Sequence, residues 1–213
     1  MAKFSQGILG GFSGKLGTVV GSVWNGKQVM RARAASHKDA NTEAQQQQRS
    51  KWSLAIEFLK PLTAYLRTAC APYAQSVSLT TFNVAMSYLL KNAIDGEYPD
   101  YTVVPEMVRV SFGSLANVLN PAVSVADSVA TFTWADNTGD GDAAETDLVL
   151  PVVYNVEAGA AVCDVASFAR SAAQAQLDIP DAWSGSELHC YVATISADGG
   201  TASNSLYVGS VTA

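Results

Sequence analysis

The residues with the clearest capacity for chemistry lie in an acidic loop, DNTGDGDAAETD, between Asp136 and Asp147. Carboxylates at alternating positions followed by glycine are typical of a calcium-binding EF-hand loop. The loop departs from that pattern at Thr138, where Asp or Asn is required, and at Asp147, which replaces the bidentate Glu. Its flanks have strand patterns instead of helical ones. We therefore expect a solvated acidic turn and no metal site, with calcium binding as the alternative.

Few other residues of the chain are suited to catalysis. The segment GGFSGKLG fails as a phosphate-binding loop, because Leu16 follows Lys15 where Ser or Thr is required and Leu9 replaces the first glycine. Cys190 cannot readily use His189 as a base, because adjacent strand residues point to opposite faces. No Gly-x-Ser-x-Gly elbow occurs. We expect no catalytic residue, no cofactor and no enzymatic activity.

The three cysteines, Cys70, Cys163 and Cys190, have neither CxxC nor zinc-ligand spacing. An odd number of cysteines is poorly suited to a disulfide framework. Buried free thiols are favoured, while pairing of Cys163 with Cys190 across two strands stays open.

A glycine-rich segment, residues 7–33, contains the rejected phosphate-binding motif and has its own pattern. Residues 1–17 alternate glycine with large apolar side chains, and we expect this arm to be mobile unless it docks on another surface. The runs Thr18–Trp24 and Lys27–Arg33 are rich in strand formers, and Asn25-Gly26 joins them. Asn-Gly between two such runs indicates a β-hairpin with a type I′ turn.

An isolated two-stranded hairpin is marginal in water, so this hairpin must lie against something else. Alternation places Val20, Ser22 and Trp24 on one face. We expect an assembly interface formed by apolar, turn and basic residues of the arm and hairpin: Phe12, Lys15, Val20, Trp24, Asn25, Gly26, Lys27, Arg31 and Arg33.

Charge is distributed unevenly along the chain. Residues 1–51 carry a net charge of +6, residues 52–100 carry −1, and residues 101–213 carry −11. A basic end and an acidic end favour head-to-tail attraction between copies, and so predict a homo-oligomer held through the basic N-terminal arm. The basic residues lack the density and aromatic interleaving of a nucleic-acid-binding face, so nucleic acid is not the expected partner.

Residues 36–99 have helical periodicity. Thr42 and Gln45 fit a capping box at the start of an amphipathic helix, which Pro61 should kink or divide and Pro72 should close. A second helix should begin near Ser78 and end at Asp95-Gly96, which gives an antiparallel pair. The apolar positions of the first helix recur every three or four residues: Trp52, Ala55 or Ile56, Leu59, Leu62, Leu66 and Ala69.

After Pro99 the periodicity changes to that of short strands. Seven strands within residues 100–213 argue for an antiparallel β-sandwich of the immunoglobulin or fibronectin type III kind. The fold class is then α+β, with an arm and hairpin (1–35), a helical region (36–99) and the sandwich (100–213). The predicted strands are Val103–Phe112, Ser124–Trp134, Leu148–Asn155, Ala160–Val165, Ala175–Ile179, Leu188–Ser196 and Ser203–Gly209.

The opening MAKFSQGILGGFSGKLGTVVGSVWNGKQVMRAR, followed by TEAQQQQRSKW, resembles an uncharacterised family of Bacteroides-type bacteria and their phages. The resemblance covers most of the chain and implies no assigned activity, so no functional residue is carried over. By analogy, Gly-Lys-x-Gly hairpins before a Thr-x-Ala-Gln-Gln helix look like parts of phage structural proteins. The resemblance continues through Phe82-Asn83, Leu90-Lys91-Asn92, Trp134-Ala135-Asp136-Asn137, Ser196-Ala197-Asp198-Gly199 and Asn204-Ser205.

These patterns lead to one main functional hypothesis and one alternative. The main hypothesis is a non-enzymatic, self-associating structural protein of a phage virion or tail, with other virion proteins as further partners. The alternative is an adhesin-like module that recognises a glycan or a protein through sandwich loops near 136–147 and 198–200. Glycines interrupt the first apolar run, so we expect no cleaved signal peptide. No stretch of 18 apolar residues occurs, so we expect no membrane partner. Synthesis in the cytoplasm and a virion or extracellular location after release follow as expectations.

Overall fold

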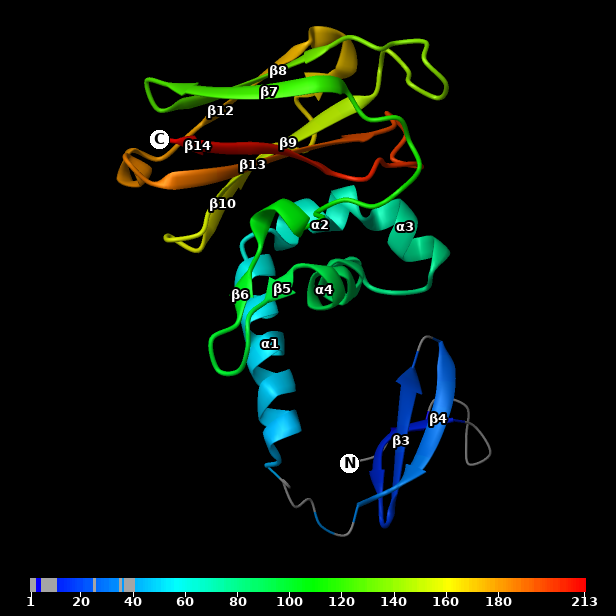
Figure 1. Cartoon of the computed structure of the whole chain (residues 1–213). Coiled ribbons are helices and arrows are strands. Elements are labelled where there is room, and N and C mark those ends of the chain that lie inside the picture. Colours follow the sequence, from blue (N-terminus) through cyan, green and yellow to red (C-terminus); the bar gives the residue numbers. More distant parts are fainter. Residues whose placement is uncertain (1–2, 5–10, 25, 35, 37–40) are drawn as a thin grey trace. The chain divides into compact units, whose positions relative to one another are not determined.

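The computed structural model describes residues 3–4, 11–24, 26–34, 36 and 41–213, and the chain forms two compact units, Met1–Thr42 and Glu43–Ala213. Strands come first, helices follow, and an antiparallel strand-rich region completes the chain (Figure 1). The fold class is α+β, as predicted.

The first unit is an antiparallel sheet with the strand order β1-β2-β3-β4. The predicted hairpin is confirmed: Trp24 pairs with Lys27 across a two-residue connection, and Gly26 has a φ of +75°. Asn25 lies outside the described residues. The strands are β1 (Lys3–Phe4), β2 (Phe12–Leu16), β3 (Val19–Trp24) and β4 (Lys27–Ala32).

The arm differs from expectation where the structure describes it. Residues 12–16, predicted to be mobile, form β2 and pair with β3, so the hairpin has a third strand beside it. The two strands meet where Gly14 pairs with Gly21, and a Cβ atom on Gly21 would lie 2.2 Å from the carbonyl oxygen of Phe12. Glycine at position 21 therefore permits this close approach. The arm residues 1–2 and 5–10 lie outside the described residues.

The helical region contains four helices instead of the predicted pair. The first helix begins directly after Thr42, and Pro61 separates it from the second, both as predicted. Pro72, expected to end a helix, instead lies in the first turn of a third helix. Backbone N–H groups in a first turn have no partner within the helix, so the missing N–H of proline costs no hydrogen bond there. The helices are α1 (Glu43–Leu59), α2 (Thr63–Ala69), α3 (Ala71–Ser76) and α4 (Thr81–Asn92).

The end of α4 also differs from the prediction. Thr80 caps its start, accepting a hydrogen bond from the backbone N–H of Asn83 at 3.2 Å, while its last residue is Asn92. Asp95-Gly96, expected to cap the helix, belongs instead to a two-stranded ribbon. Its strands are β5 (Ile94–Asp95) and β6 (Thr102–Val103).

Two facing sheets form the C-terminal sandwich. One sheet has the order β12-β8-β7, and the other has the order β10-β9-β13-β14, with the short strand β11 also pairing with β9. The strands are β7 (Leu119–Ala126), β8 (Val129–Ala135), β9 (Leu148–Asn155), β10 (Ala160–Cys163), β11 (Phe168–Ala169), β12 (Gln174–Asp178), β13 (Glu187–Ile195) and β14 (Leu206–Thr212).

Two strand predictions were wrong. The predicted strand Ser124–Trp134 is interrupted by a tight turn, because Asp127 and Ser128 both adopt left-handed backbone conformations, with φ values of 50° and 59°. The predicted strand Val103–Phe112 is mostly irregular and contains the 3₁₀ turn η1 (Pro105–Met107), where proline cannot donate to a ladder. The other two 3₁₀ turns of the described residues are η2 (Arg170–Ala172) and η3 (Asp181–Trp183).

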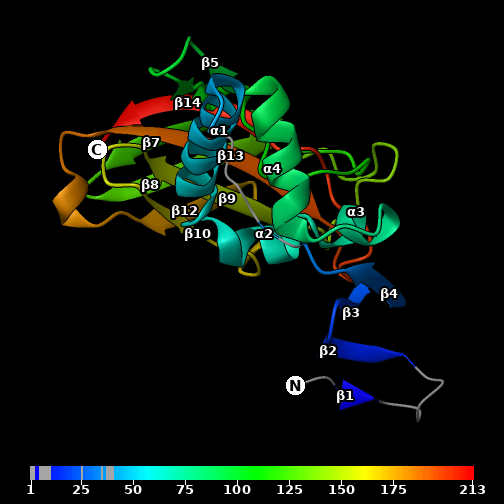
Figure 2. The same ribbon diagram turned by 90° about the horizontal axis from the view of Figure 1, so that it is seen from below.

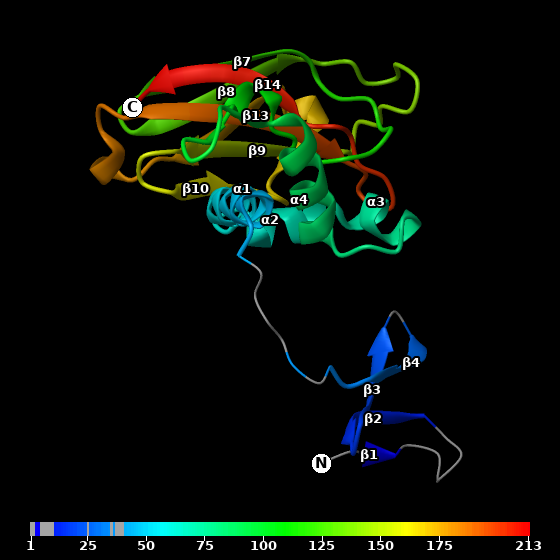
Figure 3. The same cartoon turned by 60° about the horizontal axis from the view of Figure 1, so that its bottom comes forward.

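The helices and the sandwich share one central sheet, so the second unit has three layers (Figures 1 and 3). Seen from below, α1 and α4 lie across this sheet (Figure 2). On β9, Val152 and Tyr154 pack with the helices, whereas Val149 and Val153 pack in the sandwich core. A strand covered on both faces is a continuous apolar run, which explains the sequence LVLPVVYN. The second unit runs from residue 43 to residue 213, across the predicted boundary at 99/100.

The same alternation along β9 shows that Cys163 and Cys190 do not form a disulfide. Cys163 pairs with Val152 and Cys190 pairs with Val153, which are adjacent residues of β9 and point to opposite faces. Cys163 therefore packs with the helices and Cys190 packs within the sandwich core, and all three cysteines are free thiols.

Candidate functional site

The N-terminal sheet has one basic face. The strand register aligns Lys15 on β2 with Val20 on β3 and Arg31 on β4. Alternation places Trp24 and Lys27, which pair with each other, on this same face. Residues of the predicted assembly interface are thus brought together here from three strands.

The opposite face of this sheet is apolar. Leu16 pairs with Val19, and Val23 and Met30 lie on the same side by alternation. Phe12 also belongs to this face, because it lies an even number of residues from Leu16 on β2. The predicted interface is therefore divided, with Phe12 on the apolar face and the cations on the basic face.

Neither face is covered by the unit itself. Trp24 is 71% exposed on the basic face, and Met30 is 67% exposed on the apolar face. Among the described residues of Met1–Thr42, only Gly21 is buried. In the described part of this unit, the single sheet layer has no second layer against which to bury its side chains.

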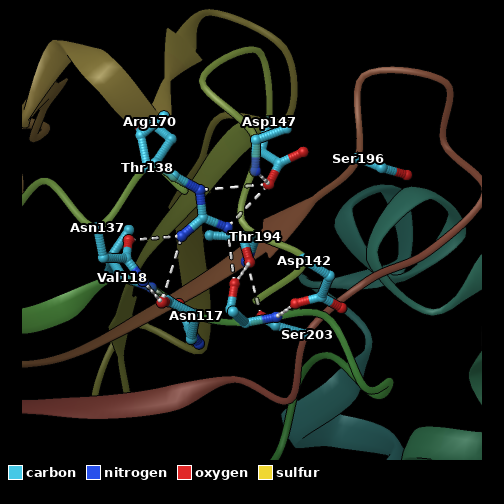
Figure 4. A network of polar contacts seen from close by, with 12 residues as sticks. Asn117, Val118, Asn137, Thr138, Asp142, Asp147, Arg170, Thr194, Ser196 and Ser203 are labelled. Atoms are coloured by element: carbon cyan, nitrogen blue, oxygen red, sulfur yellow. Dashed lines mark hydrogen bonds and ion pairs between the residues drawn. The ribbon is translucent and has the colours of Figure 1, made fainter. Parts of the chain in front are cut away.

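Carboxylates of the acidic loop are held by hydrogen bonds and an ion pair to other groups of the same chain (Figure 4). Asp147 forms an ion pair with Arg170, with Nη2 and Oδ2 3.0 Å apart, and Asp142 accepts a hydrogen bond from the backbone N–H of Ala116 at 2.9 Å. Asp136 accepts bonds from the hydroxyl and N–H of Thr138, which lower the pKa of its carboxyl. Across the described part of the chain, no group of three or more His, Cys, Asp or Glu side chains is placed to hold a metal ion.

Arg170 is the centre of this polar network, and sequence reasoning missed it. Its side chain is fully buried and donates hydrogen bonds to Asn137 Oδ1 at 2.8 Å and to the Ala116 carbonyl at 2.7 Å. Asn117 contributes a third acceptor through its carbonyl, at 3.3 Å. The one available signal was its residue type, since Arg109 and Arg170 are the only Lys or Arg residues after position 100.

The second predicted loop, 198–200, is a closed turn. Ser196 Oγ donates to Asp198 Oδ1 at 2.6 Å, and the N–H of Gly200 donates to the same oxygen at 2.9 Å. These bonds lower the pKa of the Asp198 carboxyl. Trp183, in the 3₁₀ turn η3, is buried in the sandwich core at 6% exposure and offers no stacking surface to a glycan.

His189 and the thiol of Cys190, which are adjacent in the sequence, do not form a base–nucleophile pair. His189 Nδ1 lies 3.0 Å from the Tyr207 hydroxyl, while Cys190 is buried in the sandwich core. Burial raises the pKa of the Cys190 thiol to about 12, and burial also lowers the pKa of His189. A thiol so hard to ionise is a poor nucleophile at neutral pH.

A family model matches residues 11–209, which include β2, β3 and β4 as well as most of the second unit. The chain belongs to DUF6266, a family of unknown function. No curated protein and no solved structure matches the chain. Among the described residues, no helix is both long and apolar enough to cross a membrane.

Proposed function

We propose that the protein is a non-enzymatic structural protein that assembles with copies of itself through its N-terminal sheet. The observation that carries the proposal is the single-layer sheet with a basic face, an apolar face and exposed aromatic and aliphatic side chains on both. Large exposed apolar patches on a folded unit mark interaction surfaces. A phage virion or tail is the proposed setting, by analogy with the resemblance of the N-terminal segment.

Charge supports a second copy as the partner. The unit Met1–Thr42 has six Lys or Arg against Asp39, a net charge of +5, whereas Glu43–Ala213 has seven against eighteen Asp or Glu, a net charge of −11. The basic face of one copy is therefore complementary to the acidic second unit of the next. Contacts between unlike surfaces are head-to-tail, and they build rings or open chains.

Charge reversal on the basic face tests the proposal. The double variant Lys15→Glu/Arg31→Glu should lower self-association in light scattering at low salt, because both side chains are exposed on one face of the sheet. The matched control is Lys60→Glu/Arg67→Glu, which changes the net charge equally on exposed residues of the second unit. Equal association of the two variants would contradict the proposal.

The alternative is a module that binds a glycan or protein, carried on a sandwich that we propose to be immunoglobulin- or fibronectin-type-III-like. Three strands, β12-β8-β7, facing β10-β9-β13-β14 support that comparison. Trp183 is buried, and the loops 136–147 and 198–200 are closed by their own hydrogen bonds, which counts against glycan recognition there. A glycan array probed with the labelled protein tests this alternative, and hits would favour it over assembly.

A further inference from the structure

A groove of about 800 Å³ opens within the second unit, where α3 and α4 meet the chain segments 109–114 and 200–204. Figure 1 shows α3 and α4 at the end of the unit where the connection between β13 and β14 also lies. The volume falls within the range of about 300–1,000 Å³ that ligand pockets occupy. The predicted sites do not include it.

The charged residues that line the groove are basic, although the second unit as a whole is acidic. Two cations, Lys91 and Arg109, line it, and none of its lining residues is Asp or Glu, although the unit has a net charge of −11. Both side chains are exposed, and within the described part of the chain the ammonium of Lys91 and the guanidinium of Arg109 make no hydrogen bond or ion pair. The guanidinium of Arg109 lies 5.0 Å from the ring centroid of Tyr88, which holds its position beside the groove.

The remaining lining is largely apolar and partly exposed. Tyr73, Val77 and Leu79 are 41%, 40% and 50% exposed and follow one another along α3 and the turn after it. Phe112 is buried in the lining, and its ring centroid lies 5.8 Å from that of Tyr73 and 5.4 Å from that of Tyr88. The groove therefore combines an aromatic floor, an aliphatic rim and two unpaired positive charges.

The floor of the groove is a fixed feature of the fold. A Cβ atom on Gly113 would lie 1.9 Å from the carbonyl oxygen of Ala202, so only glycine lets these backbone segments meet. The N–H of Leu115 donates to that same carbonyl at 3.0 Å, and the N–H of Gly113 donates to Asn204 Oδ1 at 3.4 Å. Hydrogen bonds from the backbone N–H groups of Gly113 and Leu115 thus hold the chain beside Phe112 against the connection between β13 and β14.

We propose that this groove binds an acidic peptide segment that carries an aromatic or aliphatic anchor. Lys91 and Arg109, which lack an acidic partner, complement carboxylates, and the exposed side chains of Val77 and Leu79 complement an apolar anchor. A hydroxylated sugar ring would place its polar groups against these aliphatic side chains, which disfavours an anionic saccharide. The proposal does not depend on association through the N-terminal sheet.

The chain itself supplies a suitable probe. The segment Asp95–Tyr101, DGEYPDY, has three carboxylates and two tyrosines, and Tyr98 is 39% exposed in the ribbon formed by β5 and β6. A fluorescein-labelled peptide of this sequence, titrated with the full-length protein at low salt, reports binding by anisotropy. The control peptide NGQYPNY keeps the aromatics and removes the charge.

The acidic peptide should bind, and the neutral control should bind more weakly. Lys91→Glu/Arg109→Glu should weaken binding by about tenfold or more, since two exposed charge pairs are lost and two repulsions replace them. Lys60→Glu/Arg67→Glu should leave binding unchanged, because neither residue lines the groove. The variant Leu79→Ser should also weaken binding, whereas Leu119→Ser, at a site of similar exposure (47%), should not.

The proposal would be overturned by no binding of the acidic peptide, by equal binding of both peptides, or by equal effects of the two charge-reversed pairs. Displacement of the peptide by a sulfated oligosaccharide that binds more tightly would assign the groove to a saccharide and also overturn it. Peptide binding measured in Lys15→Glu/Arg31→Glu separates the two proposals, because this variant should keep the groove intact while losing self-association.

Discussion

Arg170 and Asp147 form a buried ion pair, with Nη2 and Oδ2 3.0 Å apart and side-chain exposures of 0% and 3%. The guanidinium also contacts two backbone carbonyls, those of Ala116 and Asn117, in the segment that leads from the helices into the sandwich. The indole of Trp134 donates to the Arg170 carbonyl at 2.8 Å. One side chain thus ties the acidic loop to the entrance of the sandwich.

The variant Arg170→Met should lower the free energy of unfolding by about 3–5 kcal/mol, because it leaves the Asp147 carboxylate buried without its partner. Urea denaturation measures the change. Arg67→Met, at an exposed position on α2, is the control and should alter stability by no more than about 0.5 kcal/mol. Similar losses in both variants would show that the buried pair has no special part in stability.

Stability should fall at alkaline pH, because burial raises the pKa of the Cys70 and Cys190 thiols from 9.0 to about 12. In the folded state both thiols stay protonated, while in the unfolded state they ionise near pH 9. Their contribution is therefore complete below pH 9 and is lost as the pH rises toward 12. Each thiol should lower the unfolding free energy by about 1.4 kcal/mol per pH unit in that window.

The variant Cys190→Ala isolates this effect. Its packing loss is the same at every pH, so only the slope of stability against pH between 9 and 12 should become shallower. Cys163→Ala, at a half-buried thiol on β10, should change the slope less. Urea midpoints measured from pH 8 upward, with identical slopes for the wild type and Cys190→Ala, would rule out a contribution from this thiol.

The variant Gly113→Ala should destabilise the second unit by about 1–3 kcal/mol, because the new methyl group meets the Ala202 carbonyl and the backbones must separate. Thermal unfolding followed by circular dichroism measures the loss. In Gly200→Ala the added Cβ would lie 3.2 Å from the Asp198 carboxylate, which can rotate, so a smaller loss is expected. A reversed order of the two midpoints would contradict the close approach at Gly113.

Local signals in the sequence predicted several elements correctly. Asn25-Gly26 indicated the hairpin because a two-residue turn needs left-handed backbone conformations, and Thr42 indicated the start of α1. The strand β9 has the predicted bounds, Leu148–Asn155. Asp127-Ser128 makes a similar tight turn without glycine, so the predicted strand there was not divided.

Features that depend on distant contacts were not predictable from periodicity. Trp52 fits the apolar stripe of α1 but is 47% exposed, because the shared core begins at Ala55 on that helix. No local sequence pattern indicated the role of Arg170, because its hydrogen-bond acceptors lie 23 to 54 residues earlier in the chain. The groove was not predicted for the same reason. Its cations come from separate parts of the chain, Lys91 from α4 and Arg109 from the irregular segment after η1.

The measurement that tests the assembly proposal most directly is sedimentation velocity of the full-length protein over a range of concentration and salt. The proposal predicts species larger than the 22.3 kDa monomer at low salt, which shift toward the monomer as salt screens the attraction between the basic face and the acidic unit. A protein that sediments as a monomer at every concentration and at low salt would contradict it.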